Sequence, residues 1–137
     1  MDKLRHIAIS VSDPEAAAQF FEKAFGMERA GQAMRGIYMT DGVMNVALLN
    51  FANETVPGYA GLKDVRGVIH FGMWVDDLDA SEERVKAAGG TYLTGRKETN
   101  PNVFYEVKYR MPDGIVFDIT ESGWKGAVKE VAAVPAQ

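Results

Sequence analysis

The sequence predicts an α+β fold in which two tandem βαβββ modules form one domain. Landmarks in the first half of the chain recur in the second half. Each copy is patterned as a strand, a helix and then further strands. The length of 137 residues is that of a single domain. These three observations together define the fold class.

The repeat consists of four landmarks that recur in the same order. They are His6 and His70, Asp13 and Asp77, Gly26 and Gly90, and the Asp-Gly pairs at 41–42 and 113–114. The first three pairs are 64 residues apart and the last pair is 72 apart, so one insertion explains the difference. We therefore divide the chain into a first module over about residues 4–50, a connector over 51–66, a second module over 67–121 and a tail over 122–137.

The first module opens with a strand and a capped helix. Residues 4–11 are rich in apolar and β-branched residues and are short enough for a buried strand. Ser12 or Asp13 caps the helix, and Pro14 suits its first position. An apolar stripe that includes three phenylalanines follows, and Gly26 ends the helix.

The second module repeats this pattern. Residues 68–75 predict a strand, and Asp77 opens a helix whose inward-facing residues are Leu78, Val85 and Ala88. In each module an Asp-Gly pair then predicts a hairpin, because glycine readily takes the positive φ of the turn. The hairpin strands are residues 37–40 and 43–49 in the first module, and 103–110 and 115–120 in the second.

Two remaining segments carry no regular pattern. Residues 95–102 form a polar stretch that predicts a loop before the penultimate strand. The tail from Ser122 is expected to form one short helix or to remain frayed.

The composition excludes several classes of function. A net charge of -4 counts against nucleic acid or an anionic membrane as the main partner. The chain has no cysteine, so it can form neither a disulfide scaffold nor a thiolate site. No segment approaches the roughly 20 apolar residues of a membrane span, and the first residues do not resemble a signal peptide. We expect a cytoplasmic protein of one domain.

The two histidines of the chain occupy the same position in the two modules. If the modules pack about a pseudo-two-fold axis, His6 and His70 meet in one pocket. Neutral imidazole is the commonest metal ligand, and a divalent ion would remove the cost of burying two basic groups side by side. The alternative is a pair of core histidines, each satisfied by one hydrogen bond.

The last predicted strand offers a third ligand. Asp118 and Glu121 are three positions apart, so they point to opposite faces of a regular strand and only one can face the pocket. Two histidines and one carboxylate form a facial triad with positions open for substrate or water. The alternative is that neither residue binds a metal: Asp118 then accepts a hydrogen bond from the backbone or an arginine, and Glu121 is exposed at the strand end.

The duplicated unit resembles the vicinal oxygen chelate superfamily. The resemblance rests on RHIAI at His6, IHFGMWVDDLD at His70 and MPDGIVFDITE near the end, and it spans about residues 4–121. It implies that each module curls its sheet around a cup, where a metal is bound by His6 and His70. The superfamily's usual carboxylate lies four residues after the glycine of the last turn, which favours Asp118 over Glu121.

The resemblance also implies a missing fourth ligand. In the first module the residue four positions after Gly42 is Val46, which cannot bind a metal. The neighbouring Asn45 points to the other face of a regular strand. The chain therefore keeps at most three protein ligands, where glyoxalase I and the epimerases of the superfamily use four.

The penultimate strand supplies the candidate catalytic groups. Alternation places Tyr105, Val107 and Tyr109 on one face and Phe104, Glu106 and Lys108 on the other. One set lines the cup, so Glu106 is the candidate base and Tyr105 and Tyr109 are the other candidates, whereas the alternative for Glu106 is an exposed position. Four aromatic residues either form an apolar lid or belong to the core: Phe51, Tyr59, Trp74 and Trp124.

Several reactions of the superfamily are compatible with three ligands. Ring-cleaving dioxygenases expect an additional pocket histidine, which this chain lacks. Thiol transferases of the fosfomycin-resistance type expect a cationic pocket, for which the candidates are Arg35, Arg96, Lys97, Lys108 and Arg110. Bleomycin-binding members hold a ligand without metal and have no need of paired histidines.

We therefore predict a metal-dependent lyase or isomerase that acts on a small organic substrate with vicinal oxygens. The ion is a divalent first-row metal, with Fe, Mn, Ni, Co and Zn as candidates. We also predict a homodimer, because open curled sheets leave edges and apolar faces that a second subunit covers. The cup can then be formed within one chain or across the dimer.

Overall fold

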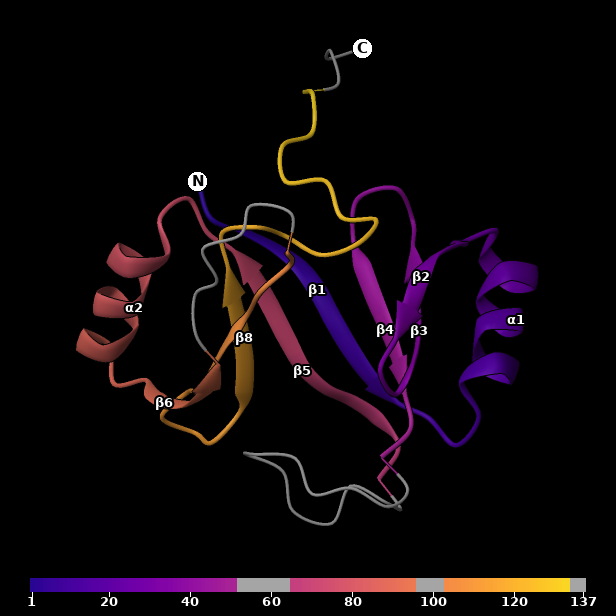
Figure 1. The fold of residues 1–137 in the computed structure, drawn as a ribbon, viewed down its shortest axis with the longest axis horizontal. Coiled ribbons are helices and arrows are strands. Elements are labelled where there is room, and N and C mark those ends of the chain that lie inside the picture. Colours follow the sequence, from indigo (N-terminus) through magenta and orange to yellow (C-terminus); the bar gives the residue numbers. More distant parts are fainter. Residues whose placement is uncertain (52–64, 96–102, 134–137) are drawn as a thin grey trace.

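A computed structural model describes residues 1–51, 65–95 and 103–133. It confirms the α+β fold with two βαβββ modules (Figure 1). The first module contains β1 (Lys3–Ser10), α1 (Pro14–Phe25), β2 (Glu28–Ala33), β3 (Gly36–Thr40) and β4 (Asn45–Leu49). The second contains β5 (Gly67–Trp74), α2 (Leu78–Ala87), β6 (Thr91–Gly95), β7 (Val107–Arg110) and β8 (Val116–Thr120).

The helix starts follow the predicted capping. The side chain of Asp13 accepts a hydrogen bond from the Ala16 N–H at 3.1 Å, so Asp13 and not Ser12 caps α1. The side chain of Asp77 accepts one from the Ala80 N–H at 3.0 Å at the equivalent point of α2. The same local interaction therefore begins both helices of the repeat.

Both hairpin turns form with their glycines at positive φ. Gly42 has φ 99° and Gly114 has φ 90°, values that side chains other than glycine rarely adopt. The strands that they join are shorter than predicted: the segment expected from residue 103 becomes β7 only at Val107. Strands β2 and β6 were not predicted, because their short segments ERAGQA and TYLTG lack a clear alternation of apolar and polar residues.

All eight strands form one mixed sheet in the order β2-β3-β4-β1-β5-β8-β7-β6. The central pair, β1 and β5, is antiparallel, whereas β1 pairs with β4 and β5 with β8 in parallel. Each module therefore supplies one half of the sheet, and the halves are related by a pseudo-two-fold axis at the β1–β5 pair. Figure 1 shows α1 and α2 at the two ends of this sheet, with β1 and β5 crossing its middle.

Each helix covers its own small core. Ala18 of α1 packs with Ile37, Met39, Val46 and Leu48 of β3 and β4. Leu78 of α2 belongs to a second cluster formed with residues of β7 and β8. Because the helices take one face of the sheet, the opposite face between the modules is left for a site.

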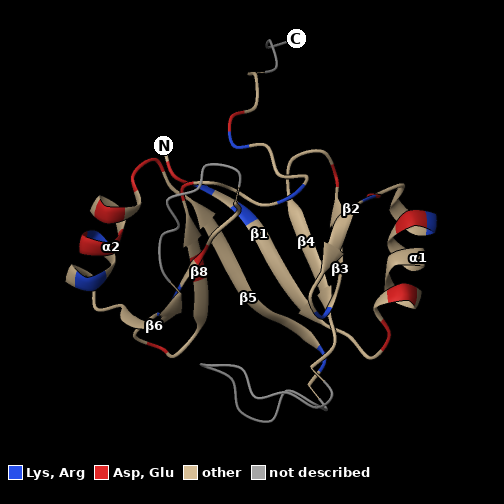
Figure 2. Cartoon of the chain, viewed as in Figure 1, with Lys and Arg blue, Asp and Glu red and all other residues tan. Residues whose placement is uncertain are grey.

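Charged residues lie mainly on the helices and in the connections, and the strands carry few of them (Figure 2). Neither of the helices in the described part of the chain is long and apolar enough to cross a membrane. The few charged residues on the strands therefore need a local explanation, and two of them, Lys108 and Asp118, lie in the site described below.

The described part of the tail forms no helix, and most of it is held against the rest of the molecule. Residues 122–129 form a strap that returns from β8 to the first module, whereas residues 130–133 are exposed and the end of the described chain points away from the sheet (Figure 1). Four of its carbonyls accept side-chain hydrogen bonds: Lys125 O from Asn45, Gly126 O from Thr40, and both Val128 O and Lys129 O from Arg5. The Val128 N–H donates to Val43 O. These long-range bonds satisfy the backbone in place of helical ones.

Candidate metal centre

The two histidines meet on the inner face of the sheet. In the β1–β5 pair His6 lies opposite Gly72, and His70 lies opposite Ala8, so the imidazoles are diagonal neighbours. Their Nε2 atoms are 3.0 Å apart, and both residues are buried. Both come from one chain, so a single chain brings the two histidines together.

Asp118 joins them from β8. It lies opposite Gly72 on the other side of β5 and is fully buried. Its Oδ2 atom is 3.1 Å from His70 Nε2 and 3.8 Å from His6 Nε2. Gly72 thus occupies the middle of the group, and its lack of a side chain leaves room for the three ligands to approach one another.

The Oδ2 atom of Asp118 is buried without a hydrogen-bond partner among the described residues. Its contact with His70 is short but does not have hydrogen-bond geometry. A buried carboxylate oxygen without a partner is rare because its desolvation is then uncompensated. The two Nε2 atoms and this oxygen all lie within 4.8 Å of one another, a spacing that a metal ion can bridge. The residues present therefore fit a divalent ion.

Asn45 sets the tautomer of His6. The Asn45 Nδ2 group donates to Lys125 O at 2.8 Å, so the amide oxygen of Asn45 faces His6. His6 Nδ1 lies 2.6 Å from that oxygen, which can only accept, and therefore Nδ1 carries the proton. His6 Nε2 then presents a lone pair to the centre. This is the arrangement that metal-ligating histidines use.

Burial also favours the neutral form of His6. It lowers the pKa of His6 to about 4; the charge of Asp118 opposes this, and His70 adds to it. At neutral pH the imidazole is uncharged, as a ligand must be.

Lys108 binds Oδ1, the other carboxylate oxygen of Asp118. Its Nζ atom donates to Asp118 Oδ1 at 2.6 Å, and it lies 3.6 Å from Glu106 Oε1. Burial alone would lower the pKa of Lys108, but the charges of Asp118 and Glu106 outweigh it and raise that pKa. Burial alone would raise the pKa of Asp118, but the contact with His70 and the charge of Lys108 hold it well below its usual range. Both groups are therefore charged at neutral pH.

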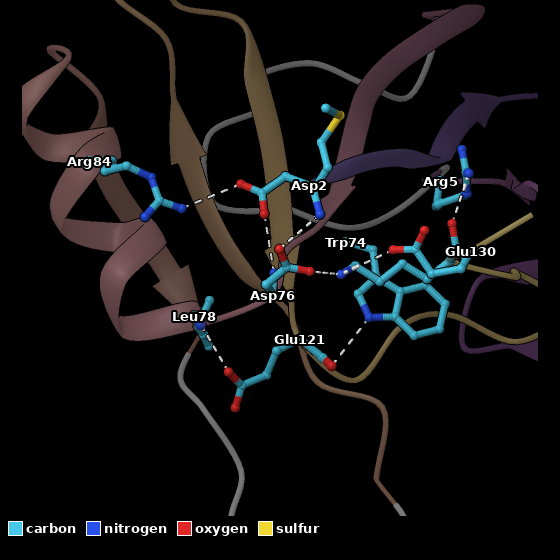
Figure 3. Close-up of polar contacts among 10 residues, drawn as sticks. Asp2, Arg5, Trp74, Asp76, Leu78, Arg84, Glu121 and Glu130 are labelled. Carbon is cyan, nitrogen blue, oxygen red and sulfur yellow. Dashed lines mark hydrogen bonds and ion pairs between the residues drawn. The ribbon is translucent and has the colours of Figure 1, made fainter.

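Glu121, the alternative third ligand, lies outside the centre. Its Oε2 accepts a hydrogen bond from the Leu78 N–H at the start of α2, and its carbonyl accepts one from Trp74 Nε1 (Figure 3). Its Oε1 accepts from the Tyr105 hydroxyl at 2.7 Å. The Asp118 side chain lies with the two histidines, whereas Glu121 takes part in anchoring α2.

The position equivalent to Asp118 in the first module is Ala47, not Val46. Gly72 lies opposite Asp118, and Ala8, which is 64 residues before Gly72, lies opposite Ala47. Counting four residues from the turn glycine gives the wrong position in the first module. The reason is that β4 starts three residues after Gly42, whereas β8 starts two residues after Gly114. Val46 consequently packs in the core under α1.

Asn45 was also expected to point away from the centre, and this expectation is wrong. Since Asn45 and Ala47 are two positions apart in β4, both face the centre. Ala47 leaves the fourth ligand position without a donor atom, and Asn45 supports His6 from the same strand. A polar residue in the otherwise apolar segment NVALL was the available sequence signal for this role.

The centre lies at the wall of a cup with a volume of about 250 Å³. The lining residues are His6, Ala33, Met34, Arg35, Tyr38, Ala47, Leu49, Phe51, His70, Glu106 and Lys108. The cup therefore combines the two histidines with an apolar wall, one acidic residue and two basic residues. This combination suits a small polar ligand with an apolar portion.

Lys108 of β7 and Glu106, which directly precedes this strand, both line the cup. The predicted catalytic tyrosines lie on the opposite face. Tyr109 is fully buried in the core under α2, where its hydroxyl donates to Glu82 at 2.6 Å, and Tyr105 packs against the same core. The structure therefore gives neither tyrosine access to the cup.

Glu106 has the properties of a proton-transfer group. Burial, followed by the charge of Asp118, raises the pKa of Glu106 to about 7. Its side chain lines the cup and is still 40% exposed, so the carboxyl group is accessible to a ligand. Its Oε2 accepts a hydrogen bond from Trp124 Nε1 at 2.8 Å, which fixes the carboxyl group in the wall. A carboxyl group with a pKa near neutrality can both take and return a proton.

Of the four aromatic candidates for a lid, Trp124 has the clearest place at the site. Its ring stacks on His6, with centroids 4.7 Å apart and planes 11° apart. Phe51 lines the cup beneath the guanidinium of Arg35, 5.5 Å from its ring centroid. Trp74 does not line the cup. Tyr59 lies outside the described residues, as do the cationic candidates Arg96 and Lys97.

Comparison with known proteins agrees with this architecture. The family model described as Glyoxalase/Bleomycin resistance protein/Dioxygenase superfamily matches residues 3–119. The chain therefore belongs to this superfamily, the vicinal oxygen chelate proteins that its repeated histidine motifs resemble. A search of the curated proteins found no match.

Several solved structures share the fold. A hypothetical protein from Bacillus halodurans C-125 is 16% identical, with a TM-score of 0.65 over 97% of this chain and 99% of that one. The Mn(II)-bound glyoxalase from Novosphingobium aromaticivorans is 20% identical, with a TM-score of 0.66 over 96% of this chain and 44% of that one. Methylmalonyl-CoA epimerase from Mycobacterium tuberculosis is 18% identical, with a TM-score of 0.64 over 85% of each chain. At these identities the likeness is one of fold.

Proposed function

We propose that the protein is a metal-dependent lyase or isomerase that acts on a small organic substrate with vicinal oxygens. The observation that carries this proposal is the convergence of His6 Nε2, His70 Nε2 and the unpartnered Asp118 Oδ2 in a buried centre. A divalent first-row ion is the group that three such atoms accommodate, with Fe, Mn, Ni, Co and Zn as candidates. The Mn(II) glyoxalase of the same fold supports this choice.

A bound ion would supply Lewis acidity that stabilises a developing oxyanion. His6, His70 and Asp118 would hold it at the wall of the cup and would leave its remaining coordination positions to substrate and water. Ala47 leaves the fourth ligand site of the superfamily without a donor, which keeps these positions open.

Glu106 would carry the proton in this reaction. Its carboxyl group lines the same cup as both histidines, and Trp124 fixes its orientation. A proton on the carbon next to a coordinated oxygen is the one that lyase or isomerase chemistry must remove. With its pKa near 7, Glu106 can take that proton and return it to the same or a neighbouring atom.

Metal content is the first test. Protein purified without chelators should hold about one divalent ion per chain, measured by inductively coupled plasma mass spectrometry. His6→Ala, His70→Ala and Asp118→Ala should each lose it, because each removes one of three ligands. Glu121→Gln is the matched control and should retain it, since Glu121 contacts Leu78 and Tyr105 instead. A wild type that binds no added Mn²⁺, Zn²⁺ or Fe²⁺ would overturn the proposal in favour of a metal-free binding protein.

Proton exchange is the second test. The metal-loaded protein in D₂O should exchange the carbon-bound proton of one or more members of a panel of compounds with vicinal oxygens: the C2 proton of 2-hydroxy acids and the C3 proton of 2-oxo acids, followed by proton NMR. Glu106→Gln should slow this exchange by about 10² to 10⁴-fold while metal content stays at the wild-type value. Equal exchange by the variant and the wild type would remove Glu106 from the mechanism.

A further inference from the structure

Lys108 binds one carboxylate oxygen of Asp118, and the proposed metal would bind the other. Lys108 lies directly opposite Asp118 in the β7–β8 pair, so the two side chains extend from the same face of the sheet. The Lys108 Nζ atom is 2.6 Å from Asp118 Oδ1, whereas Oδ2 lies on the side of the histidines, 3.1 Å from His70 Nε2. The register of the sheet therefore divides the carboxylate between a fixed cation and the centre.

We propose that Lys108 is a positioning residue that makes Asp118 a one-oxygen ligand of the metal. The inference rests on the metal centre of the proposed function. A carboxylate can bind an ion through one oxygen or through both. With Lys108 on Oδ1, only Oδ2 remains for the ion. The protein then contributes three ligand atoms, and a six-coordinate ion keeps three positions for substrate and water.

The charge of Lys108 has a second consequence. The Nζ atom lies within hydrogen-bond distance of the ligand carboxylate, and the Lys108 side chain is only 14% exposed, so solvent screens its charge only in part. A cation there draws charge from the carboxylate and weakens its attraction for the metal. The bound ion retains more of its own positive charge for an oxyanion in the cup. Lys108 thereby lowers the affinity of the site for the metal and raises the affinity of the bound metal for anionic ligands.

An ion pair that serves only stability predicts something different. In that case removal of Lys108 would weaken the fold but would alter neither the number of Asp118 oxygens on the metal nor the preference for anions. The coordination mode therefore separates a positioning role from a structural one.

The test compares wild type with Lys108→Met, which removes the charge but keeps an unbranched side chain of similar length. Lys129→Met is the matched control, because Lys129 is a comparably buried lysine (17% exposed) paired with Asp76 outside the cup. Mn²⁺ affinity is measured by isothermal titration calorimetry, oxalate serves as the anionic probe of the open positions, and crystal structures of the Mn²⁺ complexes count the Asp118 oxygens at ligand distance.

We expect one Asp118 oxygen on the ion in wild type and two in Lys108→Met. Lys108→Met should bind Mn²⁺ about tenfold more tightly and should bind oxalate to the Mn²⁺ form about tenfold more weakly, since one positive charge is lost beside the ion. Lys129→Met should match wild type in all three measurements.

The possible failures are distinguishable. If wild type binds no metal, the proposed function fails and the role of Lys108 with it. If wild type binds metal through both Asp118 oxygens, the Lys108 inference alone is overturned, whether or not Lys108→Met folds. Unchanged Mn²⁺ affinity and one-oxygen ligation in Lys108→Met would also overturn that inference while leaving the metal centre intact.

Discussion

Asn45 shows how one residue outside the ligand set prepares the centre. Its Oδ1 accepts a hydrogen bond from His6 Nδ1–H, and its Nδ2 group donates to Lys125 O of the tail. The lone pair of His6 Nε2 therefore faces the centre before any metal arrives. Such support matters because a ligand in the wrong tautomer must rearrange before it can bind.

We expect Asn45→Val to lower metal affinity by about 10- to 100-fold, because His6 loses the partner that fixes its tautomer. Competition with a fluorescent chelator measures the change. Asn50→Ala is the control: the Asn50 side chain binds Ser12 O and does not line the cup. Equal affinity of Asn45→Val and wild type would show that His6 is oriented by its packing alone.

The burial of His6 makes the metal-free protein sensitive to acid. The pKa of His6 is about 4 in the folded chain and about 6.5 when the chain unfolds. Between these values the unfolded state binds a proton that the folded state does not. The stability linked to His6 is therefore complete above pH 6.5 and is lost as the pH falls towards 4.

In the presence of a chelator, the free energy of unfolding of wild type should fall by about 2 kcal/mol between pH 7.5 and pH 5 through His6. His6→Gln should lack this part of the loss, so the two urea-unfolding profiles should converge at low pH. Parallel profiles for the two proteins would contradict a lowered pKa of His6.

At the scale of elements, the close approach of β1, β5 and the tail depends on Gly72. A Cβ atom at this position would lie 2.7 Å from the Trp124 ring and 2.9 Å from His6 Cβ. Neither neighbour can yield without disturbing the stack between them. The absence of a side chain on β5 is thus a condition for the placement of His6.

Gly72→Ala should lower the free energy of unfolding by about 1–3 kcal/mol, because the added methyl overpacks the site. Urea unfolding measures this change. Adding Trp124→Leu, which gives the methyl space, should recover part of the loss, so a double-mutant cycle should show favourable coupling. Additive effects of the two substitutions would mean that Gly72 and Trp124 do not compete for the same space.

At the scale of the whole molecule, the sheet has two open ends and several exposed apolar side chains. The terminal strands β2 and β6 each have one edge without a partner strand in the described chain. Large hydrophobic residues are exposed on both modules, among them Phe20, Phe25, Val68 and Phe104. Such edges and faces are commonly covered by a second subunit.

We therefore propose a homodimer. Sedimentation equilibrium at about 10 µM protein should give twice the 15.0 kDa of one chain. Because His6, His70 and Asp118 come from one chain, dilution to the monomer should leave metal stoichiometry at one ion per chain. A mass of one chain at this concentration would contradict the dimer.

The sequence by itself determined the repeat, the two helices with their caps, the hairpin turns and the pairing of His6 with His70. Caps and turns depend on a few neighbouring residues, such as Asp13 with Ala16, so their signals lie within one short segment. The histidines needed only one further assumption, that two copies of one module pack symmetrically. That symmetry places equivalent positions together whatever the details of the loops.

Only the tertiary structure decided which residues complete the centre. Whether Ala47 or Val46 faces inward depends on one residue in a turn, and a shift of one position moves every side chain of a strand to the other face. The division of Asp118 between Lys108 and the histidines depends on the register of three neighbouring strands. The place of Trp124 depends on a tail whose partners in the first module are 80 or more residues away in the chain. Register and long-range contacts arise from the packing of the whole sheet, and no local pattern of residues encodes them.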